Sequence, residues 1–418
     1  MSFSPPRLAI WQKLSDLRRI SRILWVRVAL ILALSILAAL SAKFLDPFIP
    51  QGPKDRFGAA STLPILTILA NTMLAVATFS LGVMVSSHRT MAEQTTPRIH
   101  RLLMDDTSTQ SMLATFVGAF AFALSSIILF RGGYYSDSAS VIVFGATVLV
   151  VLAIIFSLVR WIHQLSRIGS MDYALERTED TARDALIELK RYPYFGGQCL
   201  TDDAALPSDA MPVPSRVSGY LRRIDMQRLQ KAAEAAGGMI YITALPGDLV
   251  LSDEAIVHVT GSPDPEQIRA AIVVATNRSY EQDPRFAIQA MRETASKALS
   301  PGVNDPGTAV EVVARLQRLL WDGLQTKPVQ NRPVYDRVFL KSVPDSVLIA
   351  SAFQDITRDG AAFVDVLEAI NAALTAMANR CDNTGSDQIE ALRDALRQHA
   401  DVGLKTQAER DRLGVSDS

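Results

Sequence analysis

Four long stretches of apolar residues constrain this chain more than any other feature of its sequence. They cover residues 26–45, 63–85, 112–130 and 139–159, and the last three contain no Asp, Glu, Lys or Arg. A helix of roughly 20 apolar residues crosses the hydrocarbon core of a bilayer, whereas helices in soluble cores rarely reach that length without a charge. The sequence therefore predicts a membrane α-helical bundle of four transmembrane helices, in a transmembrane domain that covers residues 26–162.

The first stretch is expected to remain in the protein as a span. Arg27 and Lys43 lie near its ends, where long side chains reach the interface. It is followed by Asp46-Pro47-Phe48 and not by the small-residue cleavage site of a signal peptide. Residues 1–25 form a basic N-terminal segment. Within it the stretch from Leu8 to Ile23 alternates apolar and basic side chains, which is typical of a cytoplasmic amphipathic segment that binds anionic membrane lipids and also of a simple basic flank.

Basic residues near the span ends predict the orientation. Three segments carry most of them, namely the N-terminal tail, the loop after the second span and the residues after the fourth: Arg7, Lys13, Arg18, Arg19, Arg22, Arg89, Arg98, Arg101, Arg160, Arg167 and Arg177. The opposite side carries Lys54, Arg56 and Arg131, besides Lys43 at the boundary. A multi-pass protein with both termini in the cytoplasm is therefore expected.

The second span is the most polar of the four. Thr67, Asn71, Thr78 and Gly82 follow one another at spacings that place them on one helix face. In lipid such groups face other helices or water, so they either form interhelical hydrogen bonds or line a cavity or pore built from repeated copies. No charged residue lies in the middle of a span, which argues against a proton-relay pump or a charge-moving voltage sensor.

Beyond the spans the chain has the composition of a soluble α+β region, expected in the cytoplasm. We divide it into a connecting helix over 163–195, a linker over 196–215, a small β-rich module over 216–262 and a mainly helical domain over 263–414. Three helices begin with Asp-Pro, because Asp accepts hydrogen bonds from first-turn amides and Pro fits the first helical position. They are expected at Asp264–Thr276, Asp283–Leu299 and Asp305–Leu324.

The loop between the last two of these helices, residues 298–309, has the most distinctive sequence of the region. A helix stop at Pro301-Gly302 and a capped start at Asp305 account for most of it. That interpretation leaves open why Ser300, Asn304 and Thr308 share the same turn with Asp305, and the loop is a candidate to bind an ion, a lipid headgroup or another subunit. A nucleophilic role of Ser300 is disfavoured because no partnered His and no GxSxG elbow accompanies it.

Several classes of function are disfavoured by what the chain contains. Cys199 and Cys381 are isolated, and the five histidines form no HExxH pair, so no metal site and no cofactor is predicted. A net charge of −1 offers no general attraction to nucleic acid. No carboxylate, His or Cys constellation for catalysis can be assembled, so an enzyme is disfavoured.

Several short motifs resemble a known family. Pro97 and Arg98, followed by Asp106 and Gln110, stand between the second and third spans. Ser218-Gly219-Tyr220, Pro246-Gly247-Asp248, Tyr280–Phe286 and the loop Ser300–Ala309 follow further along. Together they resemble the domain of unknown function (DUF2254) family of predicted bacterial membrane proteins, over nearly the whole chain. The resemblance implies a bacterial inner (plasma) membrane and this topology, and it implies no activity.

Three functions are therefore weighed. The first is an oligomeric channel-like or transport-related membrane protein with a cytoplasmic regulatory domain, which the polar face of the second span favours. The second is a non-enzymatic sensor or interaction scaffold, favoured by the connecting helix and the capped helices. The third is a membrane-bound enzyme. The expected partners are membrane lipids and further copies of the chain, and the sequence identifies no other protein partner.

Overall fold

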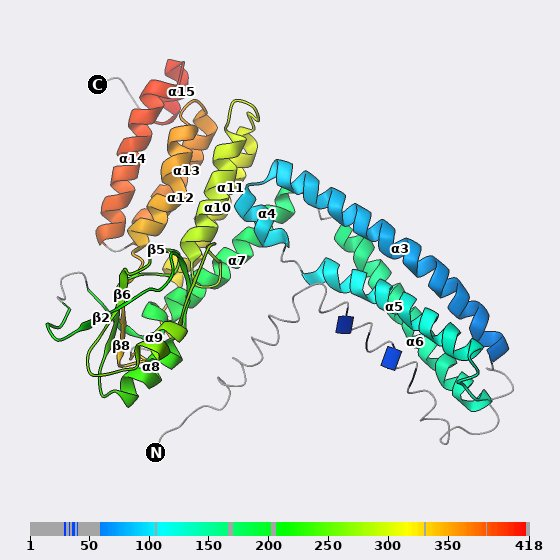
Figure 1. The fold of residues 1–418 in the computed structure, drawn as a ribbon. Coiled ribbons are helices and arrows are strands. Elements are labelled where there is room, and N and C mark those ends of the chain that lie inside the picture. Colours follow the sequence, from blue (N-terminus) through cyan, green and yellow to red (C-terminus); the bar gives the residue numbers. More distant parts are fainter. Residues whose placement is uncertain are drawn as a thin grey trace. The chain divides into compact units, whose positions relative to one another are not determined.

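A computed structural model describes residues 29, 30, 33, 36, 37, 40, 59–104, 107–165, 170–201, 206–329, 332–381 and 383–414. The chain divides into two compact units, residues 1–173 and residues 174–418. We call the first the apolar unit and the second the mixed unit, after the composition of the first and the helices and strands of the second. Each unit is described by itself (Figure 1).

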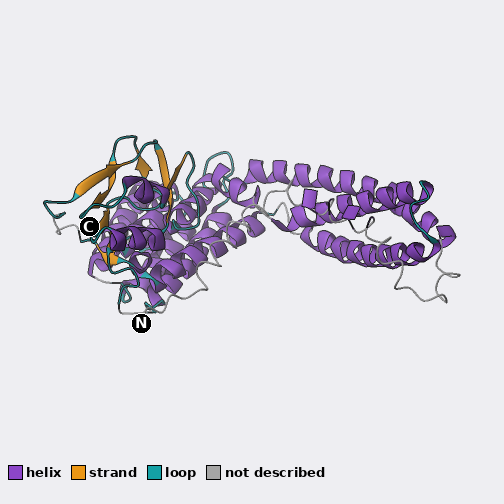
Figure 2. Cartoon of the chain, turned by 60° about the horizontal axis from the view of Figure 1, so that its bottom comes forward, coloured by secondary structure: helices purple, strands orange, loops and turns teal. Residues whose placement is uncertain are grey.

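Three long helices of the apolar unit lie side by side in both views (Figures 1 and 2). They are α3 (Ala59–Gln94), α5 (Thr107–Arg131) and α6 (Asp137–Leu165), and the short α4 (Pro97–Met104) joins the first two. Among the described residues, three helices are long and apolar enough to cross a membrane, and they contain the predicted spans 63–85, 112–130 and 139–159. The predicted span 26–45 lies largely outside the described residues, so three apolar helices are established and the fourth stays a prediction.

Small side chains let α5 approach its neighbours closely. Ala114, Gly118 and Ala121 are buried on one face of α5, as residues that favour close helix packing in membranes are. Larger side chains, among them Leu66, Phe116 and Phe122, fill the core of the bundle. On α6 the outward side chains are large and apolar, which suits contact with lipid tails: Leu149, Leu152, Ile155 and Phe156.

Two small sheets form the β part of the mixed unit. The five-stranded sheet has the order β1-β8-β4-β6-β2, and the three-stranded sheet has the order β5-β3-β7. β8 is parallel to β1 and β4, while the other pairs are antiparallel. The strand bounds are β1 (Gln198–Cys199), β2 (Met211–Pro214), β3 (Gly219–Ile224), β4 (Ile240–Ile242), β5 (Leu249–Val250), β6 (Ala255–Val259), β7 (Ile272–Ala275) and β8 (Val338–Leu340).

A common apolar core lies under both sheets, and α8 (Met226–Ala235) and α9 (Pro265–Ala270) contribute Leu229 and Ile268 to it. Most of the remaining helices of the mixed unit pack against one another. Their bounds are α7 (Met171–Arg191), α10 (Pro284–Ala298), α11 (Pro306–Gln325), α12 (Asp345–Asp359), α13 (Val364–Ala378), α14 (Asn383–Gly403) and α15 (Gln407–Arg412).

The Asp-Pro starts of three helices are confirmed. Asp264, Asp283 and Asp305 each accept a backbone hydrogen bond in the first turn of α9, α10 and α11. The expected length of the first of these helices is wrong, because α9 ends at Ala270 and the β-branched run from Ile272 forms β7, which pairs with β3.

Strands also occupy segments where the sequence predicts none. β1 and β2 lie within the predicted linker 196–215, and β8 lies within the predicted helical domain. β1 has two residues and β8 three, and they pair with each other across the fold (Gln198↔Phe339). Strands of two or three residues are too short to show the alternation of apolar and polar residues by which a strand is predicted. The sheets of the mixed unit therefore extend beyond the predicted β-rich module over 216–262.

Candidate functional site

The polar residues of the second predicted span lie on the outward face of α3. Thr67, Asn71 and Thr78 are all exposed, whereas Met73 and Ala77 of the same helix are buried in the bundle. At 3.6 residues per turn the three polar residues fall within an arc of about 40°. Within the described part of the chain, this arc is therefore not part of the packed core.

Two of these residues satisfy their own hydroxyl groups. Thr67 donates to the carbonyl of Leu63 at 2.9 Å, and Thr78 donates to the carbonyls of Leu74 and Ala75 at 3.0 and 2.9 Å. Such bonds to the preceding turn are the common solution for a threonine in a membrane helix. Asn71 differs, because its amide forms no hydrogen bond with any other residue that the structure describes. Thr67 and Thr78 therefore tolerate lipid, and Asn71 does not.

The motif between the second and third spans forms a tight corner. Thr95 and Thr96 are buried, and the Thr96 hydroxyl accepts a hydrogen bond from the Ile99 amide at 3.5 Å at the start of α4. Pro97 is the first residue of α4 and is exposed, and Arg98 is half-buried on the next position. Asp106 lies outside the described residues, and Gln110 stands in the first turn of α5 with an undescribed side chain. The structure thus places Pro97 and Arg98 on one short helix.

The Ser300–Thr308 loop is a compact, internally bonded turn between α10 and α11. Ser300 donates its hydroxyl to the Lys297 carbonyl at 2.6 Å. Asp305 accepts the Thr308 amide at 3.0 Å and the Thr308 hydroxyl at 2.6 Å, and these bonds hold the pKa of the Asp305 carboxyl below its usual range. Asn304 has φ +52°, the left-handed region that Asn tolerates better than most residues. The end of α10 and the capped start of α11 therefore account for the positions and hydrogen bonds of Ser300, Asn304, Asp305 and Thr308. No binding role follows from their geometry.

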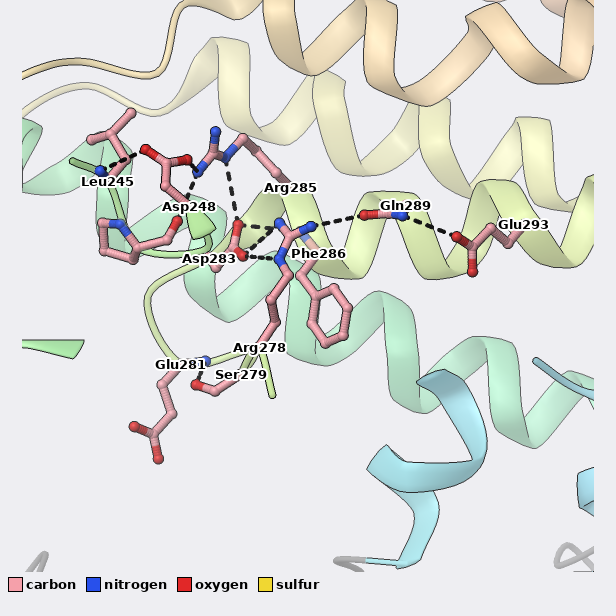
Figure 3. A network of polar contacts seen from close by, with 11 residues as sticks. Leu245, Asp248, Arg278, Ser279, Glu281, Asp283, Arg285, Phe286, Gln289 and Glu293 are labelled. Atoms are coloured by element: carbon pink, nitrogen blue, oxygen red, sulfur yellow. Dashed lines mark hydrogen bonds and ion pairs between the residues drawn. The ribbon is translucent and has the colours of Figure 1, made fainter. Parts of the chain in front are cut away.

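Two further motifs meet in an ion network around the buried Asp283, which Figure 3 shows. Asp283, only 2% exposed, accepts hydrogen bonds from Nε and Nη2 of Arg278 at 2.9 and 2.6 Å. Arg285 lies 3.6 Å from Asp283 and donates to Asp248 at 2.9 Å and to the Pro246 carbonyl at 2.8 Å. The turn before β5 and the start of α10 are thereby joined through paired charges.

The electrostatics of this network are balanced. Burial raises the pKa of Asp283, and the charges and hydrogen bonds of Arg278 and Arg285 oppose that shift. Arg278 also lies over the ring of Phe286 at 4.7 Å and donates to Gln289 at 2.8 Å. Because two guanidinium groups face two carboxylates, no charge remains to hold a ligand, and we interpret the network as a structural joint.

The sequence singles out both motifs, Pro246–Asp248 and Tyr280–Phe286, but it does not predict that they contact each other. It gives no signal for Arg278. Arg278 stands between β7 and α10 in no recognisable pattern, so only the fold brings it to Asp283. A second cluster was missed in the same way: Glu179 of α7, 7% exposed at its side chain, is bound by Arg315 at 3.2 Å and Arg318 at 3.0 Å of α11. Among the described residues, no group of three His, Cys, Asp or Glu is placed to hold a metal ion.

Three apolar helices long enough to span a bilayer, followed by a mixed unit with two small sheets, define a membrane protein with a large additional domain. The family model described as "Predicted membrane protein (DUF2254)" matches residues 21–376, and the chain belongs to this family. The resemblance drawn from the motifs is thereby confirmed.

Two mycobacterial proteins are similar to part of the chain in sequence. Two uncharacterized proteins, one from Mycobacterium bovis and one from Mycobacterium tuberculosis, are each 25% identical to the chain over 297 residues. The matches cover 68% of this chain and 55% of each relative, so the chain spans about half the length of the curated relatives it matches. No solved structure matches the chain.

Proposed function

We propose that the protein is a channel-like membrane protein in which several copies of the chain surround a hydrated path lined by the polar arc of α3. The observation that carries this proposal is the amide of Asn71, exposed and without a described hydrogen-bond partner in the middle of a long apolar helix. The mixed unit then acts as a regulatory domain on the cytoplasmic side of a bacterial inner membrane, as the basic residues near the spans favour.

Energetics support a wet or protein-covered face for Asn71. Transfer of an unpaired amide from water to hydrocarbon costs about 4–8 kcal/mol, which exceeds what a membrane helix gains from one average interhelical hydrogen bond. Thr67 and Thr78 on the same arc add hydroxyl oxygens that accept from water while their protons are bound to the backbone. An arc of two hydroxyls and one amide in each copy gives a path whose wall is polar and uncharged.

Reconstitution tests the proposal. Purified protein in liposomes is expected to pass K⁺ and Cl⁻ with little preference, because no fixed charge lies on the arc. Asn71→Asp is expected to shift the reversal potential toward cations. A preparation that passes neither ions nor small neutral solutes in any oligomeric form would overturn the proposal.

Two threonines provide a matched pair for the same assay. Thr78→Val and Thr72→Val remove one hydroxyl each with the same change in shape, but Thr72 lies roughly 120° around the helix from Thr78. Both hydroxyls bond to the preceding turn, Thr72 to the Ile68 carbonyl at 2.7 Å. Thr78→Val should lower the flux and Thr72→Val should leave it unchanged, and equal effects of both would contradict a path along the arc.

The second candidate, a non-enzymatic sensor or scaffold, is favoured by one observation. Glu179 binds Arg183 at 2.8 Å within α7 and two arginines of α11, so α7 and α11 are held together by a charge cluster centred on the buried Glu179 and Arg315. Such a clamp transmits a movement of α7 to the helical part of the mixed unit. A deletion strain indifferent to envelope stress, together with pull-downs that recover no specific protein, would overturn this candidate.

A further inference from the structure

A cavity of about 460 Å³ lies in the mixed unit where α7 ends and β1 begins. Its volume falls in the range of small-molecule sites. Residues 328 and 332–334 also line it. The side chains with polar or aromatic groups that could contact a ligand are Arg191, Tyr192, Tyr194, Cys199 and Arg332.

Two unpaired positive charges line this cavity. Arg191 and Arg332 are exposed, neither forms an ion pair within the described part of the chain, and no Asp or Glu is among the lining residues. Another cavity of the unit, of about 450 Å³, differs in this respect. There Glu266 pairs with both lining arginines, Arg216 and Arg269. The cavity beside Arg191 therefore carries a net positive charge, whereas the arginines of the cavity beside Arg216 are paired with Glu266.

Aromatic and proline side chains supply the walls. Tyr192 and Tyr194 are half-buried, and Pro193, Pro328 and Pro333 also line the cavity. Tyr194 and Phe195 both adopt left-handed backbone conformations, with φ +55° and +52°. Non-glycine residues keep such conformations only where the surroundings hold them, and such residues cluster at binding sites.

The wall is held in place before any ligand arrives. The side chains of Tyr194 and Phe195 pack against the strand core. The amides of Val334 and Tyr335 both donate to the Gly196 carbonyl, at 2.8 and 2.9 Å. A preformed wall lowers the entropy that binding costs.

We propose that this cavity binds a small soluble organic phosphate that carries a flat ring, of which a mononucleotide is the simplest example. The two guanidinium forks match the oxygens of a phosphate, and the tyrosine rings and proline faces match an aromatic base. This proposal does not depend on a conducting path, since every residue that carries it lies in the mixed unit.

Cys199 provides the readout. Its exposed thiol lies at the cavity and is hydrogen-bonded to Tyr194, an interaction that, together with burial, raises the pKa of the tyrosine to about 12. The second cysteine, the half-buried Cys381, does not line the cavity and serves as the internal reference.

The experiment measures alkylation of both thiols by mass spectrometry in the full-length protein in detergent, with AMP, GMP, UMP or inorganic phosphate added. At least one nucleotide is expected to slow labelling of Cys199 and to leave Cys381 unchanged. Arg191→Gln and Arg332→Gln are each expected to raise the half-protecting concentration at least about tenfold, the effect of losing one charge-assisted hydrogen bond. Arg216→Gln removes the same charge at the other cavity and should leave protection unchanged.

Three results would overturn the proposal. The first is the absence of protection by any nucleotide in protein whose Cys381 labelling shows it to be folded. The second is equal protection by inorganic phosphate alone, which would remove the ring from the ligand. The third is protection in nanodiscs of anionic phospholipid, but not of neutral phospholipid, without any nucleotide, which would make the ligand a lipid headgroup.

Discussion

Gly247 offers a direct test of the ion network around Asp283. It has φ +96° in the turn between β4 and β5, and its amide donates to the Leu221 carbonyl at 2.7 Å. A Cβ at this position would overlap the carboxylate of Asp283, lying 2.6 Å from its Cγ and 2.9 Å from Nη2 of Arg278. Gly247→Ala should therefore strain the backbone and also push Asp283 away from its arginine partner.

The expected magnitude follows from these two effects. A left-handed alanine costs roughly 1–2 kcal/mol. Breaking a buried charge pair costs about 3–5 kcal/mol, and a partial displacement should cost about half of that. Gly247→Ala should thus lower the free energy of unfolding by about 3 kcal/mol or more, which for a unit of this size is a fall in Tm of roughly 6–12 °C.

The matched control is Gly237→Ala. Gly237 has φ +64°, and a Cβ there would meet no atom within 4 Å, so only the backbone cost applies. Unfolding of the mixed unit in the full-length protein can be followed by the fluorescence of Trp321, with Trp11, Trp25 and Trp161 replaced by Phe. If the two alanine variants differ by less than about 0.5 kcal/mol, the contact between Gly247 and Asp283 does not exist as described.

Two further predictions concern charges of the mixed unit. Asp305→Ala should cost about 1 kcal/mol through the lost cap. Hydrogen bonds from Thr308 lower the pKa of Asp305 in the folded state, so the contribution of Asp305 is present at neutral pH and is lost as the pH falls through that lowered pKa. Wild type and variant should therefore converge in urea unfolding as the pH is lowered from neutral to strongly acidic. Glu179→Gln should cost about 3 kcal/mol because the buried Arg315 and the exposed Arg318 lose the buried carboxylate that they share. Glu311→Gln removes a half-exposed partner of Arg315 and should cost less than about 1 kcal/mol, so equal thermal shifts for the two variants would refute the clamp around Glu179.

Local patterns in the sequence predicted the parts of the fold that local physics decides. The apolar helices follow from length and the absence of charge, and α10 and α11 follow from Asp283 and Asp305, whose caps need only the next three residues. Ile272 shows the limit of this reasoning. The sequence predicts that its segment is the second half of a helix, whereas in the fold the segment forms a strand because it pairs with β3.

The candidate sites divide in the same way. Thr67, Asn71 and Thr78 share a face because a helix has a fixed period, and the structure adds that this face is outward. The cavity beside Arg191 had no signal in the sequence. It depends on the left-handed turn at Tyr194 and on the return of the chain at Arg332, about 140 residues further on, and neither follows from residue type or spacing.

The central claim is that the polar arc of α3 faces water, and cysteine accessibility tests it most directly. In a background with Cys199→Ser and Cys381→Ser, single cysteines at Asn71, Thr78 and Ile68 are labelled in sealed membrane vesicles with a charged, membrane-impermeant thiol reagent. Ile68 is 63% exposed and lies about 60–80° around the helix from the other two, on an apolar surface. The account predicts rapid labelling of Asn71→Cys and Thr78→Cys and slow labelling of Ile68→Cys. Protection of Asn71→Cys to the level of Ile68→Cys would contradict it.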